Sequence, residues 1–169
     1  DQQLLLKVAS VVGRSFAVEL VRDVFPVVAD RLRVADLLPG LVEADLLRPG
    51  EGPEAGHSYL FKHVLTQEAV YQTLLRPKRE EYHERIGKAV ETLYPDRLEE
   101  YYEVLAYHYV RSGNKDKAVE YLDLANRKAA RARAMEEAKG YFDEAMRLLD
   151  TLPETEVNHR RRIALRCGR

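Results

Sequence analysis

The chain has 169 residues, and its 46% hydrophobic and 33% charged residues exclude a disordered or fibrous protein. The 27 basic and 28 acidic side chains leave a formal charge of −1, which argues against a surface that binds nucleic acid along the whole chain. The lone cysteine, Cys167, excludes an intrachain disulfide framework, and no apolar run reaches the roughly 20 residues that span a membrane.

Three helical patterns open the chain. Apolar residues at helical spacing predict a first helix that Gly13 ends, a second that Pro26 ends, and a third that begins near Asp30. Pro39 interrupts the third pattern, and a proline inside a helix removes a hydrogen bond and clashes with the preceding turn. We therefore expect either a kink or two short helices there.

Two short extended runs follow, at residues 46–48 and 57–62. The second alternates, with Tyr59 and Phe61 on one face, as a strand does. Residues 49–53 between them are rich in Gly and Pro, which is typical of a loop. Three helices followed by two strands around such a loop predict a winged-helix domain with a small two-stranded wing. The next helix is expected over roughly 63–75.

The rest of the chain has a helical period almost throughout, with short turns that predict antiparallel neighbours. Residues 102–130 match the tetratricopeptide spacing of large and small apolar residues. The next repeat, about 34 residues on, is out of frame, because Ala106 would map to Gly140. We predict a mainly α-helical protein, with a winged-helix domain over 1–76 and a truncated array of antiparallel tetratricopeptide-like hairpins over 77–169.

Motifs for catalysis or cofactor binding are absent from the sequence. It contains no Gly-x-x-x-x-Gly-Lys-Ser/Thr phosphate loop and no dinucleotide-binding glycine motif. His83-Glu84 is not a zinc motif, because Gly87 stands where the second histidine belongs. The other histidines lack ligands at metal-binding spacing. We expect no catalytic residue, cofactor or metal in this chain.

The most specific stretch begins at Tyr59-Leu-Phe-Lys-His63 and continues through Leu-Thr-Gln-Glu68 to Tyr71. It resembles the region after the ATPase domain in bacterial signal-transducing ATPases linked to class III adenylate/guanylate cyclases, and in related transcriptional activators. The resemblance covers residues 4–150, with the Pro39 interruption as a departure. It implies a larger parent with an N-terminal ATPase domain, a cyclase domain when present, a winged helix and then helical repeats.

On this resemblance, we expect a non-catalytic regulatory and protein-interaction segment, which relays nucleotide state between the ATPase domain and sensor repeats. The parent would be an ATPase, a nucleotide cyclase or both. The start without Met, already in a helical pattern, also predicts a segment of a longer protein. No basic region precedes the first apolar stretch, so we expect no signal peptide and a cytoplasmic location without membrane contact.

Two groups of residues are candidates for contacts. The first is Lys62, His63, Gln67 and Glu68, at the boundary between the second strand and the next helix. These residues either fix the wing against that helix by capping and hydrogen bonds, or contact the adjacent ATPase domain. Catalysis is the weakest alternative, since no nucleophile accompanies them.

The second group lies on the predicted repeats and comprises Tyr107, Arg127, Lys128 and Arg131. Tyr107 lies off the apolar face of its helix, and is either solvated or part of a groove for an unidentified protein or ligand. The basic residues, with a further basic run over 160–169, form a solvated helix face or bind nucleic acid, and Arg127, Lys128 and Arg131 are also candidates for partner binding.

A DNA-binding transcriptional regulator is the alternative function, and charge argues against it. A winged helix that reads DNA needs a basic recognition helix in the major groove. The candidate helix, residues 34–44, carries Asp36 and Glu43 but no Lys or Arg. We therefore do not expect nucleic acid to be the partner.

Overall fold

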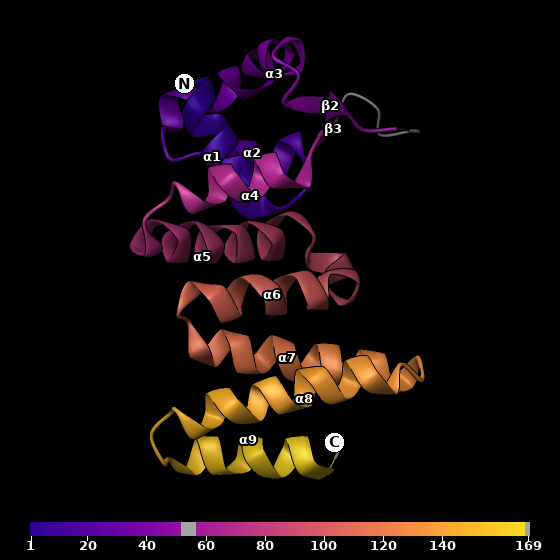
Figure 1. Ribbon diagram of the computed structural model, residues 1–169. Helices are drawn as coiled ribbons and strands as arrows, with labels where there is room; N and C mark the ends of the chain where they lie inside the picture. The colour runs from indigo at the N-terminus through magenta and orange to yellow at the C-terminus, as the bar shows by residue number, and fades with distance from the viewer. Residues whose placement is uncertain (52–56, 168–169) are drawn as a thin grey trace. The chain divides into compact units, whose positions relative to one another are not determined.

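The computed structural model describes residues 1–51 and 57–167, and it is mainly helical with one small antiparallel sheet (Figure 1). The chain divides into two compact units, Asp1–Leu93 and Tyr94–Arg169. Within the described residues, none of the helices combines the length and the apolar character needed to cross a membrane. The predicted loop over 49–53 lies partly outside the described residues, as does Arg169 at the end of the basic run.

The first unit is built around α1, which packs against each of the other α-helices of the unit. Its residues Leu5, Val8 and Ala9 have no exposed surface. Gly13 ends α1 with a φ of 146°, which a glycine adopts readily because it has no Cβ. The helices of the unit are α1 (Gln2–Val12), α2 (Val18–Val24), the 3-10 helix η1 (Val28–Arg33), α3 (Val34–Glu43), α4 (Val64–Gln72) and α5 (Arg76–Leu93).

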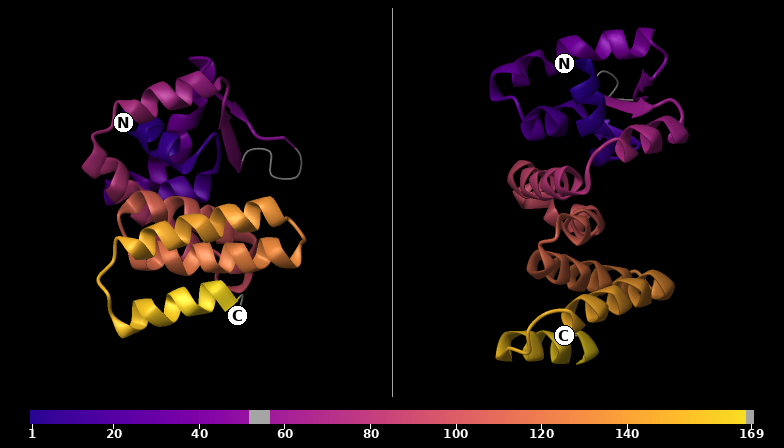
Figure 2. Two further views of the ribbon diagram at one scale, coloured as in Figure 1. Left: turned by 60° about the horizontal axis from the view of Figure 1, so that its bottom comes forward. Right: turned by 60° about the vertical axis from the view of Figure 1, so that its left-hand side comes forward.

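The sheet of this unit has three strands, where the sequence predicted two. Its strands are β1 (Ser15–Ala17), β2 (Leu47–Pro49) and β3 (Ser58–Phe61), in the order β1-β3-β2 with antiparallel pairing throughout. Phe16 faces Tyr59 across β1 and β3, and its ring packs edge-on against buried Phe61 with 6.1 Å between centroids. The sheet lies beside the helices of its unit in both views of Figure 2. A strand of three residues is too short to show an alternating pattern, so β1 was missed.

The structure excludes one of the two alternatives at Pro39. Pro39 lies inside α3, which runs from Val34 to Glu43 as one helix, so the expectation of two short helices was wrong. Leu38 and Leu41 are buried on either side of it. Because Pro39 itself is exposed, its ring projects from the helix without displacing the core.

The first unit ends at Leu93, beyond the boundary at 76 that the sequence suggested. The reason is that α5 packs against α1 and α2. The apolar stripe of α5 predicted a buried face, but a stripe does not reveal which neighbour covers it.

The second unit consists of the 3-10 helix η3 (Pro95–Tyr101) and the helices α6 (Tyr102–Ser112), α7 (Lys115–Arg131), α8 (Met135–Asp150) and α9 (Glu156–Cys167). α7 packs extensively against both α6 and α8, and α9 makes fewer contacts with α8 (Figure 1). The α6–α7 turn is tight because Gly113 adopts a left-handed conformation with φ 81° and the side chain of Asn114 caps α7.

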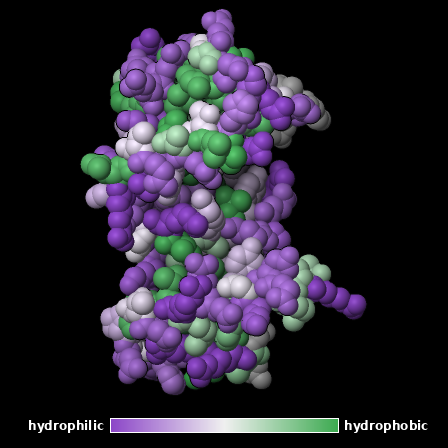
Figure 3. All heavy atoms as spheres, viewed as in Figure 1, coloured by the Kyte–Doolittle hydropathy of each residue, from purple (hydrophilic) through white to green (hydrophobic). Residues whose placement is uncertain are grey.

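Small and large apolar residues alternate in the core of this unit. Ala106, Ala118 and Ala125 are buried, and they let neighbouring helices approach closely. Tyr109 stacks on Tyr121 with 5.5 Å between ring centroids, which joins α6 to α7. Hydrophilic side chains cover much of the surface in the view of Figure 3, with apolar ones between them.

Candidate functional sites

The four residues predicted at the start of α4 lie on exposed or half-buried surface and take different roles. The Lys62 ammonium forms an ion pair with Asp45, which joins the end of β3 to the turn after α3. The His63 backbone is the N-cap of α4, and its side chain makes no capping hydrogen bond. The Gln67 amide donates to the Ser10 carbonyl at 2.7 Å and so ties α4 to α1. Glu68 is exposed on α4.

Each of the predicted basic residues on α7 has an acidic partner. Arg127 pairs with Asp123 on its own helix, with 2.6 Å between Nη2 and Oδ2. Lys128 Nζ lies 2.9 Å from Oε2 of Glu103 on α6. Arg131 Nη2 lies 2.6 Å from Oε1 of Glu99 on η3. The α7 surface therefore presents mixed charge rather than a basic patch. Three arginines of the C-terminal run are similar, since Arg160, Arg161 and Arg162 pair with Glu156, Asp116 and Asp150.

Tyr107 lines a hollow of about 280 Å³ that we call the α6–α8 groove. Its side chain is 47% exposed, and the Arg111 guanidinium lies over its ring at 3.7 Å from the centroid. Arg111 Nη1 also donates to the backbone carbonyl of Tyr107 at 3.1 Å, which keeps the Arg111 side chain beside this residue. The groove is lined by Glu103, Ala106, Tyr107, Val110, Arg111, Leu122, Tyr141 and Glu144.

The electrostatics of the α6–α8 groove are set by acids on two helices. Burial raises the pKa of the Tyr141 hydroxyl above its ordinary value, and the carboxylates of Glu103 and Glu137 raise it further. Lys128 opposes this effect. The groove thus combines two aromatic rings, an apolar floor and charged groups at its rim, which is the composition of a surface that binds a peptide side chain or a small ligand.

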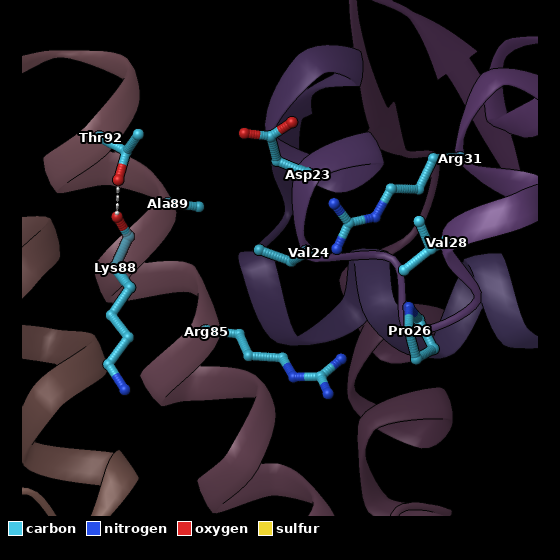
Figure 4. Close-up of a pocket in the computed structure, with 9 residues that line it drawn as sticks. All are labelled: Asp23, Val24, Pro26, Val28, Arg31, Arg85, Lys88, Ala89 and Thr92. Carbon is cyan, nitrogen blue, oxygen red and sulfur yellow. Dashed lines mark hydrogen bonds between the residues drawn. The ribbon is translucent and has the colours of Figure 1, made fainter.

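A second hollow lies within the first unit, between α2, η1 and α5, and we call it the α2–α5 cleft (Figure 4). Its volume is about 320 Å³. Arg31 and Arg85 point their guanidinium groups into it from opposite walls, and Asp23 lies at its edge. It is lined by Asp23, Val24, Pro26, Val28, Arg31, Arg85, Lys88, Ala89 and Thr92.

Sequence reasoning missed the α2–α5 cleft. Arg31 and Arg85 are far apart in the chain, and neither belongs to a recognisable motif. Only the packing of α5 against α2 brings them together. Residues that meet through tertiary packing leave no local spacing signal, so the sequence offered no means of finding this site.

Comparisons of the chain with protein-family models, with curated proteins and with solved structures found no match. Across residues 1–51 and 57–167, no three His, Cys, Asp or Glu side chains gather in a way that could hold a metal ion.

Proposed function

We propose that this chain is a non-catalytic regulatory and interaction segment of a larger bacterial signalling ATPase linked to an adenylate/guanylate cyclase. In this proposal the first unit is a winged-helix domain and the second is a short array of tetratricopeptide-like hairpins. The winged helix relays the nucleotide state of an adjacent ATPase domain, and the hairpins bind a partner. Binding then favours one domain arrangement over another.

The arrangement of elements supports both assignments. In the first unit, the three α-helices α1, α2 and α3 precede the antiparallel strands β2 and β3, which is the order of a winged helix. In the second, the positions that matched the tetratricopeptide spacing are mostly buried between α6 and α7, namely Leu105, Ala106, Tyr109, Ala118, Leu122 and Ala125. Ala130 departs from the pattern, because it is exposed while Ala129 is buried.

The single observation that carries the partner-binding role is the α6–α8 groove. Tyr107 is held in place by Arg111 and remains 47% exposed at the rim of the groove. A half-exposed tyrosine with restricted motion loses little conformational entropy on binding, and tyrosine is enriched at binding hot spots. The basic residues of α7 form ion pairs with acidic side chains, so we assign them to stabilising the hairpin.

Site-specific cross-linking in the full parent protein tests this role. A photoreactive phenylalanine at position 107 should give a cross-linked product of defined mass in cells. The matched control is position 104, because Val104 is 40% exposed on the same helix but does not line the groove. Products of equal yield from both positions would contradict the assignment of the groove.

The regulatory role has its own test. The 169-residue chain should neither bind ATP saturably nor form a cyclic nucleotide, whereas Tyr107→Ala in the parent should change the ATP hydrolysis rate and Val104→Ala should not. Saturable ATP binding or turnover by the chain alone would overturn the non-catalytic assignment. Tight duplex binding in a gel shift at low salt would favour the alternative, a winged-helix transcriptional regulator.

A further inference from the structure

We propose that the α2–α5 cleft binds a small organic oxyanion, a phosphate monoester or a carboxylate, between Arg31 and Arg85. This inference goes beyond the partner-binding role, because the cleft lies wholly within the first unit and shares no residue with the α6–α8 groove. Three of its nine lining residues are cationic and one is acidic.

Arg31 is positioned for anion binding. Its Nε donates to the Phe25 carbonyl at 3.2 Å, which fixes the plane of the guanidinium, and Figure 4 shows the group directed into the cleft. No carboxylate among the residues that the structure describes lies within ion-pair distance of Arg31, since the neighbouring Asp30 pairs with Arg33. A guanidinium held through Nε keeps its two Nη groups available for bidentate contact with an oxyanion.

Arg85 supplies the opposite wall. Its Nη2 lies 3.0 Å from Glu81 one turn earlier on α5, with both side chains partly exposed. Exposed pairs of this spacing contribute little to stability, and Glu81 has a second partner in Lys78 at 2.7 Å. The Arg85 guanidinium can therefore turn to a bound anion while Glu81 stays paired with Lys78.

The other charged groups predict how selective the cleft is. Lys88 is paired with Glu84 at 2.8 Å, and Figure 4 shows its side chain running away from Arg31, so it adds positive potential without direct contact. The Asp23 carboxylate at the edge opposes an anion by like-charge repulsion. Removing the Asp23 charge should therefore strengthen anion binding. A purely structural role of the two arginines would not produce this effect.

The remaining walls indicate an organic ligand rather than a bare ion. Val24, Pro26, Val28 and Ala89 present apolar surface next to the two guanidinium groups. Burying apolar atoms of the ligand against this surface adds to the affinity from the charged contacts. We therefore expect phenyl phosphate and benzoate to bind more tightly than inorganic phosphate and acetate.

NMR titration of the arginine Nε–H signals in the full 169-residue chain tests the proposal. Phenyl phosphate is compared with inorganic phosphate, and benzoate with acetate, at constant ionic strength. We expect saturable shifts of the Arg31 and Arg85 signals, with a dissociation constant on the order of 1 mM or below. The relative affinities of the two aromatic probes then identify the source of the oxyanion as a phosphate ester or a carboxylate.

Three variants separate a built site from general surface attraction. Arg31→Gln should weaken binding by about tenfold, because it removes charge-assisted hydrogen bonds. Arg33→Gln is the matched control, since Arg33 is on the same segment, is exposed and does not line the cleft. Asp23→Asn should tighten binding severalfold. Equal weakening by Arg31→Gln and Arg33→Gln, or shifts that do not saturate, would overturn the proposal, and heteronuclear spectra of each variant establish that it is folded.

Discussion

At the scale of single residues, Gln67 joins two helices through one hydrogen bond. Its amide donates to the Ser10 carbonyl at 2.7 Å, near the end of α1 where carbonyls lack helical partners. We expect Gln67→Ala to lower the free energy of unfolding by about 1 kcal/mol, because a partly buried acceptor loses its donor. Urea denaturation measures the change. The control is Gln72→Ala at the exposed end of α4, and equal losses from the two variants would contradict this role for Gln67.

Tyr141 offers a second residue-scale prediction, on its pKa. Burial, followed by Glu103 and Glu137, raises the pKa of its hydroxyl in the folded chain. Because the folded value lies above the unfolded one, this tyrosine contributes stability that is present below about pH 10 and is lost as the pH rises through the folded pKa. Glu103→Gln removes one of the raising charges and should lower the pKa of Tyr141.

NMR titration of the tyrosine Cζ signals, with Tyr141→Phe for assignment, follows this change directly. The reference is the same titration of the chain without the Glu103→Gln substitution. An unchanged Tyr141 pKa in the Glu103→Gln variant would show that the carboxylate does not act on the groove.

At the scale of elements, two glycines of the second unit should respond in opposite ways to the same substitution. Gly113 ends α6 at φ 81°, where a Cβ meets no neighbour but the backbone conformation is strained for any L-residue. Gly140 lies within α8, exposed and with no neighbour within 4 Å of an added Cβ. Gly113→Ala should therefore destabilise the chain by about 1 kcal/mol, and Gly140→Ala should stabilise it by up to about 1 kcal/mol.

Thermal denaturation followed by circular dichroism measures both glycine variants against the unsubstituted chain. Each serves as the control for the other, since both add one methyl group to the same unit at an open position. If both substitutions changed the thermal stability in the same direction, the left-handed backbone at Gly113 would not be the reason that the α6–α7 turn requires glycine.

At the scale of the whole molecule, each compact unit has its own buried core. Leu5 on α1 and Leu149 on α8 are both fully buried, one in each unit. Truncating either to alanine leaves a cavity and should lower the stability of its unit by about 2–5 kcal/mol. We expect Leu5→Ala to speed amide hydrogen exchange within residues 1–93, and Leu149→Ala to speed it within the second unit.

Hydrogen exchange followed by mass spectrometry localises these effects to peptides from each unit. The expected result is that each substitution accelerates exchange mainly in the unit that contains it. Uniform acceleration along the chain from either variant would indicate a single cooperative unit instead.

Several features of the fold followed from the sequence alone. The apolar period located the helices, and Gly13 and Pro26 marked helix ends, because backbone conformation at these residues is a local property. The alternation of side chains around Tyr59 and Phe61 located β3, because this alternation is also a local property of the sequence. The groove residue Tyr107 could be singled out because its position off the apolar stripe is also a matter of helical spacing.

Tertiary structure alone decided which elements meet. It placed β1 beside β3, carried α3 past Pro39 and joined α5 to the first unit. It also paired Lys128 and Arg131 of α7 with Glu103 and Glu99, and brought Arg31 opposite Arg85. The physical reason is that an apolar stripe or a charge shows that a partner is needed, but it does not determine which part of the chain that partner is. The choice depends on the packing of the whole chain.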